Sequence, residues 1–185
     1  MENSCVCFSH NHHVFWRFDF DVVSPQNTVR EYQTEDRIYG AQAINRSSGT
    51  VITPITLERN ITRSTSLFRF WEVRNNSTGA GYLIYPGEED GVADTYARGD
   101  LWILRYYANE LDDGVNQTGG STEARLDNFV NNESVDNQDI VVWYHASFIH
   151  NDEGQMRPVR DEGGRPIFIE EERRGPNLYP INWGQ

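Results

Sequence analysis

An all-β fold is predicted by three features of this sequence, and we expect it to form part of a large antiparallel β-sandwich with long loops. β-Branched and aromatic residues occur in short runs, and clusters of Gly, Asn, Asp and Pro separate these runs. Residues 9–22, SHNHHVFWRFDFDV, alternate with period two, as one strand with two different faces does. No repeat or linker divides residues 1–185, so we expect one unit.

Six segments have the composition of strands. The first carries Trp16, Phe18 and Phe20 on one face, which is typical of a strand with one core face. The last is apolar on both faces, as a central strand is. The predicted strands are residues 5–22, 36–43, 66–73, 81–85, 100–107 and 139–150.

The segments between these strands are rich in turn residues. They predict loops at residues 74–81 and 86–91. Residues 110–137 are polar and rich in Gly and Asn, so we expect a surface excursion with at most one short helix, anchored by Leu126, Phe129 and Val130. The charged tail beyond His150 is expected to turn at residues 175–180.

The charge of the chain excludes some classes of partner. The formal net charge is -12 and the pI is about 4.7. Nucleic acids and anionic membranes require a basic surface, so neither is expected as a partner. No apolar run approaches the roughly 20 residues of a membrane-spanning helix, and the first residues carry no targeting signal.

Two further residue types bear on the cellular compartment. Cys5 and Cys7 have no partner pair elsewhere, so we interpret them as small buried thiols rather than metal ligands. Asparagines in N-x-[ST] sequences favour a secreted or extracellular location. These asparagines are Asn45, Asn60, Asn75, Asn76, Asn116 and Asn132.

Potential metal ligands are concentrated in the first predicted strand. His10 and His12 share one face, and Asp19 and Asp21 share the other. Imidazole suits copper, zinc, iron or nickel, whereas carboxylates suit calcium, magnesium or manganese. The segment thus predicts two metal sites in tandem. Because one strand cannot surround an ion, a third imidazole is needed, and His150 on the last predicted strand offers one.

Two spacings carry a family resemblance. The first is H-x-H, then four residues, then R-x-D-x-D, at His10, His12, Arg17, Asp19 and Asp21. The second is an acidic residue, an apolar run, a Trp-Tyr pair and a histidine seven residues after the Trp, at Asp139, Trp143, Tyr144 and His150. With residues 70–87 and 100–114, these motifs resemble the C-terminal part of the catalytic domain of the topaquinone-containing copper amine oxidases.

The resemblance implies two metal sites. The copper ligands would be His10, His12 and His150, with water completing the coordination. A second site for calcium or manganese would use the carboxylates of Asp19, Asp21 and Asp139 and the backbone carbonyls of Phe20 and Ile140. His13 and His145 match no ligand of the family, and we expect them beside the site or on the surface, with His13 on the face opposite His10 and His12.

The resemblance also implies an activity. It is the oxidative deamination of primary amines by dioxygen to aldehydes, with release of ammonia and hydrogen peroxide, in a homodimer. The family makes its quinone from a tyrosine in an N-Y-[DE] motif upstream of H-x-H, and its catalytic Asp lies further upstream. No N-Y-[DE] occurs here, and nine residues precede His10. We therefore expect a chain truncated at its N-terminus, with topaquinone only in a full-length protein and no catalytic residue in this chain.

Two other functions are compatible with H-x-H on a β scaffold. One is a non-catalytic metal-binding β-sandwich module. The other is a cupin-like non-haem iron oxygenase, which requires a glutamate a few residues after H-x-H. Phe15, Trp16 and Arg17 occupy that region here, which disfavours the cupin.

Overall fold

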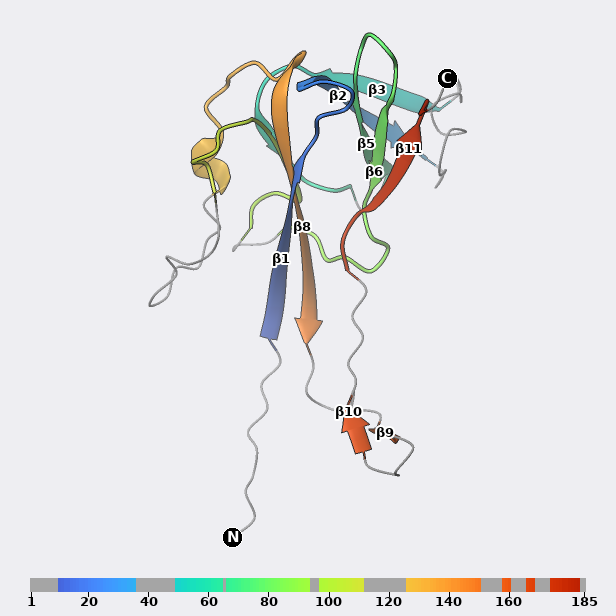
Figure 1. The fold of residues 1–185 in the computed structure, drawn as a ribbon. Helices are drawn as coiled ribbons and strands as arrows, with labels where there is room; N and C mark the ends of the chain where they lie inside the picture. Colours follow the sequence, from blue (N-terminus) through green and yellow to red (C-terminus); the bar gives the residue numbers. More distant parts are fainter. Residues whose placement is uncertain are drawn as a thin grey trace.

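The computed structural model shows a chain built almost entirely of strands (Figure 1). It describes residues 10–35, 49–64, 66–93, 97–111, 126–150, 158–160, 166–168 and 174–183, with backbone alone for residues 10, 150, 158–160 and 166–168. Within these ranges the helical structure is one short 3-10 helix, η1 (Leu126–Phe129). The strands are β1 (His10–Asp19), β2 (Gln26–Thr34), β3 (Thr50–Ile55), β4 (Arg59–Ile61), β5 (Phe68–Arg74), β6 (Gly81–Tyr85), β7 (Leu101–Arg105), β8 (Gln138–His150), β9 (Pro158–Arg160), β10 (Pro166–Phe168) and β11 (Asn177–Ile181).

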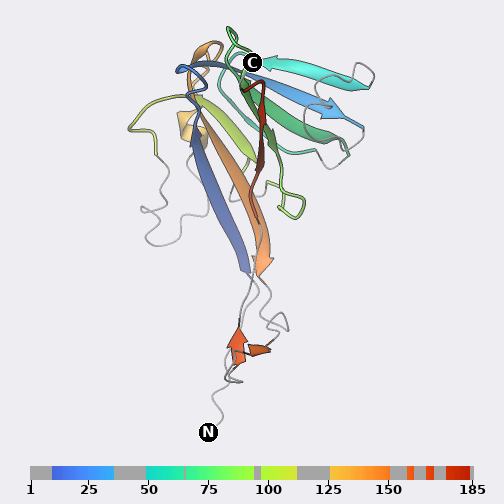
Figure 2. The ribbon, with the colours of Figure 1, turned by 45° about the vertical axis from the view of Figure 1, so that its right-hand side comes forward.

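Nine of these strands form one antiparallel sheet, which confirms the all-β prediction. The strand order is β11-β6-β5-β2-β8-β7-β4, with β1 paired to β8 and β3 paired to β2. Strands β9 and β10 form a separate two-stranded sheet. The lower parts of β1 and β8 extend beyond the other strands of the nine-stranded sheet as a two-stranded ribbon (Figures 1 and 2).

The sheet folds over on itself at a short junction. Gln26 and Asn27 of β2 pair with the first two residues of β8, and β2 then continues between β3 and β5. Side chains from both halves meet in one buried cluster, which includes Trp71 and Ile84 from one half and Val142 from the other. Burial of this apolar surface is the main favourable contribution to holding two packed layers together.

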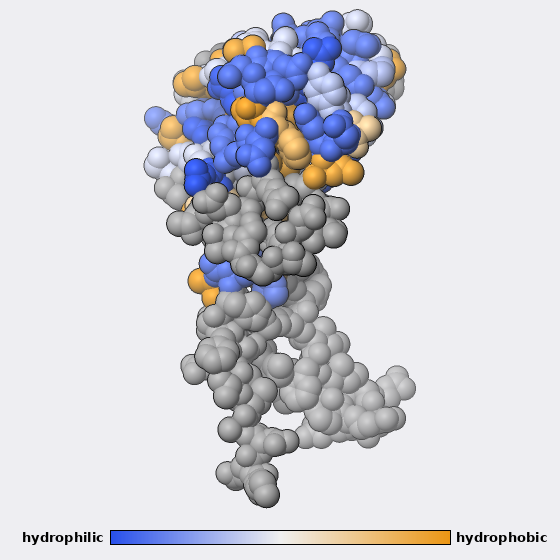
Figure 3. Space-filling view, turned by 90° about the vertical axis from the view of Figure 1, so that its left-hand side faces the viewer, coloured by the Kyte–Doolittle hydropathy of each residue, from blue (hydrophilic) through white to orange (hydrophobic). Residues whose placement is uncertain are grey.

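Each half also buries its second face. Phe70 and Tyr85 belong to an aromatic cluster of β2, β5 and β6, while Trp102 and Trp143 belong to a cluster of β7, β8 and η1. Strand β8 therefore contributes to a core on both faces, as its unbroken apolar sequence predicts. On the face shown in Figure 3, the described residues present mostly hydrophilic groups with isolated apolar patches.

The described residues confirm most of the strands predicted from the sequence. Residues 66–73, 81–85, 100–107 and 139–150 correspond to β5, β6, β7 and β8. The first strand is shorter than predicted, since β1 ends at Asp19, and residues 5–9 lie outside the described part of the chain. The strand predicted at residues 36–43 also lies outside it.

Strand β2 shows why the sequence prediction missed several elements. Its sequence, QNTVREYQT, is too polar to read as a central strand, yet Asn27, Thr28 and Thr34 are buried. Their burial is tolerated because hydrogen bonds are formed, such as those from Asn27 Nδ2 to the carbonyl oxygens of Phe20 and Ser24. Cross-strand partners on both sides, which periodicity cannot reveal, thus make β2 a strand.

The loop and tail predictions have different outcomes. Around η1, Leu126 is buried, and Phe129 and Val130 pack against the same cluster, which confirms them as anchors of this loop. Of the turn predicted at residues 175–180, the first residue is confirmed, because the chain bends at Gly175 with a φ of 117°. The rest is wrong, because β11 begins at Asn177 and pairs with β6. The short strands β3, β4, β9 and β10 were also not predicted. Among the described helical residues, no helix is long and apolar enough to cross a membrane.

Candidate metal centre

Strand β1 carries histidines at one end and Asp19 at the other, and both ends lie against the same partner strand, β8. The two strands pair antiparallel along the whole of β1, from His10 opposite His150 to Asp19 opposite Val141. The ladder therefore has a histidine end, which lies on the projecting ribbon, and an aspartate end, which lies in the body of the sheet (Figure 1). Both ends are formed by the same pair of strands.

The histidine end is defined by the register of the ladder. His10 and His150 are direct Cα partners, and His12 is the partner of Phe148. Directly opposite residues of an antiparallel pair lie on the same face, so the positions of His10, His12 and His150 share one face of the ribbon. The His12 ring stacks on Phe148 with centroids 4.9 Å apart and an interplanar angle of 18°, which holds this imidazole against β8.

The aspartate end gathers three carboxylates. Asp19, Asp21 and Asp139 each offer an oxygen, and these oxygens lie within 4.8 Å of one another. Burial raises the pKa of Asp139, and the charges of Asp19 and Asp21 raise it further. Asp139 Oδ1 is buried and has no hydrogen-bond partner among the described residues. A hard cation with oxygen ligands fits this donor set, because it would offset the mutual repulsion and supply the missing contact.

Of the two backbone carbonyls predicted for the second site, that of Phe20 is partly engaged in another contact. The Phe20 carbonyl accepts a hydrogen bond from Asn27 Nδ2 at 3.0 Å, which leaves one of its two lone pairs. Ile140 lies opposite Arg105 in the ladder between β7 and β8. Phe20 and Ile140 are neighbours in sequence of Asp19, Asp21 and Asp139, so their role in a cation site stays a prediction.

Replacing Asp139 with asparagine is expected to weaken the binding of Ca²⁺ or Mn²⁺ by roughly 100-fold, because the site loses one of three charges and one carboxylate oxygen of its least exposed residue. Isothermal titration calorimetry of the full chain measures this directly. The matched control is Asp136→Asn, since Asp136 is exposed on the turn before β8. Equal affinities for the two variants would contradict the site.

His13 and His145 lie on the face opposite the positions of His10, His12 and His150. His13 Nδ1 is 2.9 Å from His145 Nε2, and the two rings stack. Of the two placements expected for these histidines, beside the site or on the surface, the second is wrong for His145, which is completely buried, while His13 is half-buried. The pairing of two histidines that are 132 residues apart could not be found from their spacing.

Arg17, which belongs to the first motif, makes contacts that its sequence position does not suggest. Its guanidinium carbon lies 5.1 Å from the ring centroid of Tyr106 and 5.9 Å from that of Trp143. These are cation–π distances, so Arg17 packs β1 against the aromatic cluster of β7 and β8. This is a structural role on the same face as His13.

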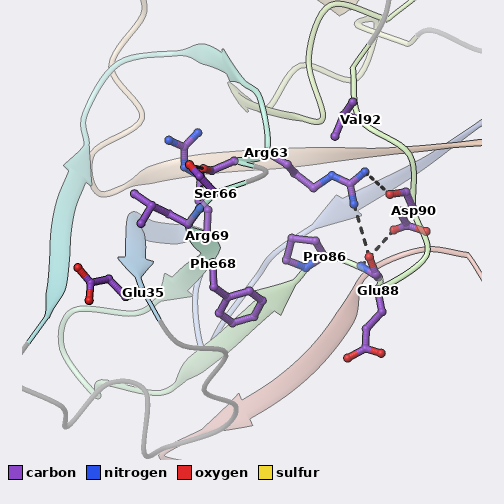
Figure 4. Close-up of a pocket in the computed structure, with 12 residues that line it drawn as sticks. Glu35, Arg63, Ser66, Phe68, Arg69, Pro86, Glu88, Asp90 and Val92 are labelled. Carbon is purple, nitrogen blue, oxygen red and sulfur yellow. Dashed lines mark hydrogen bonds between the residues drawn. The ribbon is translucent and has the colours of Figure 1, made fainter.

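A cavity of about 340 Å³ lies apart from the residues predicted as metal ligands. Its lining combines Arg63 and Arg69 with three carboxylates (Figure 4). Arg63 donates to the carbonyl oxygen of Asp90 at 2.7 Å, and Tyr144 donates to Asp90 Oδ2 at 2.6 Å. Arg63 and Asp90 thus have partners within the protein, and no sequence motif pointed to this cavity.

Solved structures of amine oxidases have the same fold. The TM-scores are 0.63 for the lysyl oxidase of Pichia pastoris, 0.59 for the amine oxidase of Aspergillus nidulans and 0.63 for the copper-containing benzylamine oxidase of Hansenula polymorpha. Sequence identities are 17%, 18% and 19%, and the alignments cover 95%, 95% and 94% of this chain. They cover 26%, 26% and 29% of the other chains, so this chain spans about a quarter of their length.

Sequence comparison identifies the family directly. Among curated proteins the sequence finds no match. It matches the family described as "Copper amine oxidase, enzyme domain" over residues 2–162, a range that contains both β1 and β8. This match covers most of the chain and agrees with the fold of the solved structures. The chain belongs to the copper amine oxidase family.

Proposed function

We propose that this chain is the copper-binding part of an enzyme that oxidatively deaminates primary amines. In the full-length protein the substrates would be a primary amine and dioxygen, and the products an aldehyde, ammonia and hydrogen peroxide. Family membership supports this class of reaction. The solved relatives include a copper-containing benzylamine oxidase, which shares the fold.

The observation that carries the proposal is the pairing of β1 with β8. The two strands that hold His10, His12 and His150 are adjacent, and His10 is the Cα partner of His150. Imidazole is a preferred ligand of copper, and three imidazoles leave room for water. We assign copper to these three histidines. When bound, copper would assist dioxygen chemistry and the formation of the quinone cofactor from a tyrosine.

The second cation is part of the same proposal. Calcium or manganese would be held by Asp19, Asp21 and Asp139 with the carbonyl oxygens of Phe20 and Ile140. The closeness of the three carboxylates and the unpartnered oxygen of Asp139 support a hard cation. This ion would tie the end of β1 to the start of β8, a structural contribution rather than a chemical one.

The chain's own residues are assigned to metal binding and positioning. Topaquinone and the catalytic base belong to the full-length enzyme, as does the expected homodimer. The N-x-[ST] sequences favour a secreted protein. Asn75 is an exception as a glycan acceptor, because it is buried and its Nδ2 donates to Ser24 Oγ at 2.9 Å.

Metal analysis of the purified chain tests the proposal. After loading with copper and dialysis, we expect about one equivalent of copper, and His10→Ala or His150→Ala is expected to reduce its affinity by at least roughly 100-fold. Asn11→Ala is the matched control, because Asn11 is exposed on the opposite face of β1. Retention of iron in place of copper, or copper binding that survives His150→Ala, would refute the proposed site.

The alternative of a non-catalytic metal-binding module predicts the same copper content. The two functions differ when the chain is expressed together with the upstream sequence of its reading frame. An amine oxidase should then react with phenylhydrazine, which traps a quinone, and should release hydrogen peroxide from a primary amine. A copper-loaded protein that does neither would favour the module.

A further inference from the structure

A chain of polar side chains crosses the face of the ribbon opposite the proposed copper ligands. It begins with His13 Nδ1, 2.9 Å from His145 Nε2, and continues with His145 Nδ1, 3.9 Å from Asp100 Oδ1. Asp100 Oδ1 is in turn 3.9 Å from Arg63 Nε, and Asp100 Oδ2 accepts the backbone N–H of Arg63 at 2.6 Å. These four residues come from β1, β8, the position just before β7 and the segment after β4.

The inner members of this polar chain are deeply buried. His145 and Asp100 are both 0% exposed, and the Arg63 side chain is 8% exposed. Burying polar groups at this depth is costly unless they have partners. Asp100 Oδ2 is satisfied by the Arg63 backbone N–H, whereas Asp100 Oδ1 forms no hydrogen bond among the described residues and is stabilised there by nearby charge alone. Asp100 is also fixed through its backbone, since its carbonyl oxygen accepts the N–H of His145 at 2.9 Å.

The carboxylate of Asp100 sets the direction of the bond between the two histidines. It lies on the Nδ1 side of His145 at 3.9 Å, beyond hydrogen-bond distance, and its negative charge favours a proton on that nitrogen. His145 Nε2 then accepts, and His13 Nδ1 donates. The His13–His145 bond therefore points from β1 into a fixed acceptor on β8.

This bond lies where the regular ladder on the other edge of β8 ends, and only single backbone bonds continue along that edge: His145 N–H to the Asp100 carbonyl and Gly91 N–H to the Ser147 carbonyl. Strand β7 pairs with β8 as far as Tyr144, and beyond this residue the ladder partner of β8 is β1. The end of the ribbon carries few apolar groups that would define the pairing, and Ile149 is 59% exposed there. Two-stranded ribbons are marginally stable in water, and strands without a clear apolar pattern slip easily.

A register slip would separate the proposed copper ligands. A shift of two residues keeps each side chain on its face but moves one strand by roughly 7 Å along the other. His10 would then lie opposite Phe148 instead of His150. The contact of His13 with His145 is diagonal, because the direct partner of His13 is Ser147. It forms in the observed register and breaks when the strands slip.

We propose that His13 and His145, anchored by Asp100, form a register lock that positions the copper-binding end of the ribbon. This inference rests on the proposed function, because it assigns to the lock the placement of the copper ligands. His13 and His145 are positioning residues in this role and do not ligate the metal.

Copper affinity provides the first test. His145→Leu keeps a side chain of similar bulk but removes the acceptor, and we expect copper affinity to fall roughly tenfold or more. His145→Gln keeps an acceptor for His13 and should recover most of the loss. The matched control is Phe15→Leu, since Phe15 stacks on His145 with centroids 4.9 Å apart but carries no hydrogen bond. It should destabilise the chain and leave copper affinity within about twofold.

Cysteine cross-linking reads the register without any metal. In a background with Cys5→Ser and Cys7→Ser, the pair Asn11→Cys and Ile149→Cys joins direct partners and should form a disulfide. The pair Asn11→Cys and Ser147→Cys is displaced by two residues and should form one only after a slip. We expect the displaced pair to cross-link when His145→Leu is added and not in its absence.

The outcomes separate the lock from the proposed function. Unchanged cross-linking together with unchanged copper affinity in His145→Leu would overturn the lock. The lock would also be overturned if the unsubstituted chain bound two equivalents of copper and His145→Leu bound only one, because His13 and His145 would then be metal ligands themselves. If cross-linking shifts as expected but the unsubstituted chain binds no copper, the proposed function fails and the register lock stands.

Discussion

Replacing Trp71 with alanine is expected to lower the free energy of unfolding by about 4 kcal/mol. Trp71 is 0% exposed and lies in the cluster where the two halves of the sheet meet. Its Nε1 donates to Glu31 Oε2 at 3.3 Å, so the variant loses a hydrogen bond as well as packing. Urea unfolding followed by tryptophan fluorescence and circular dichroism measures the change.

The control for this prediction is Trp183→Ala. Trp183 is 48% exposed, contacts Tyr82, and donates from Nε1 to the Gly81 carbonyl oxygen at 2.9 Å. Since it buries much less surface, its replacement should cost less than half as much. Similar losses for the two variants would contradict the position of the core between the halves.

Replacing Glu72 with glutamine is expected to cost about 3 kcal/mol at neutral pH. Glu72 is completely buried on β5 and accepts a hydrogen bond from the Tyr32 hydroxyl at 2.8 Å. Its carboxylate oxygens also form ion pairs, with Arg30 Nη1 3.9 Å from Oε2 and Arg74 Nη1 3.5 Å from Oε1. The amide keeps the shape but removes the charge, which leaves two cations without their shared partner. Glu89→Gln is the control, because Glu89 is a largely exposed partner of Arg174.

The same substitution should alter the alkaline limit of stability. Burial and then the charge of Glu72 raise the pKa of Tyr32 from 10.0 to about 12. The folded state therefore holds the Tyr32 proton more tightly, a contribution that is complete below pH 10 and is lost between pH 10 and pH 12. Without the Glu72 charge the shift becomes smaller. Between pH 9 and pH 11, the free energy of unfolding should fall less in Glu72→Gln than in the unsubstituted chain. An equal fall in both would contradict this coupling between Glu72 and Tyr32.

Local sequence patterns could predict the strands that have a clear apolar face or core. Strand β8 is apolar on both faces, β1 alternates, and β5 to β7 are rich in aromatic and branched residues. Strand β2 could not be predicted, because Asn27, Thr34 and other polar residues are buried there through partners distant in the sequence. β-Strand propensity is a property of a single segment. Whether the buried polar groups of that segment form hydrogen bonds depends on the neighbouring strands, which are distant in the sequence.

The candidate site shows the same limit. Its residue types and spacings could be read from the motifs, because ligand chemistry is a property of side chains. The register that makes His10 the partner of His150, and the contacts of His145 with His13 and Asp100, depend on tertiary packing. The cavity beside Arg63 and Asp90 likewise forms from segments that no motif connects.

Electron paramagnetic resonance of the Cu²⁺-loaded chain tests the central claim, that β1 and β8 together carry one copper site. With histidine nitrogens labelled, pulsed experiments count the imidazoles around the metal. We expect three in the unsubstituted chain, two after His150→Ala, and three after Asn11→Ala. A count that does not change when His150 is replaced would contradict the account, because the copper would then not lie between the two strands.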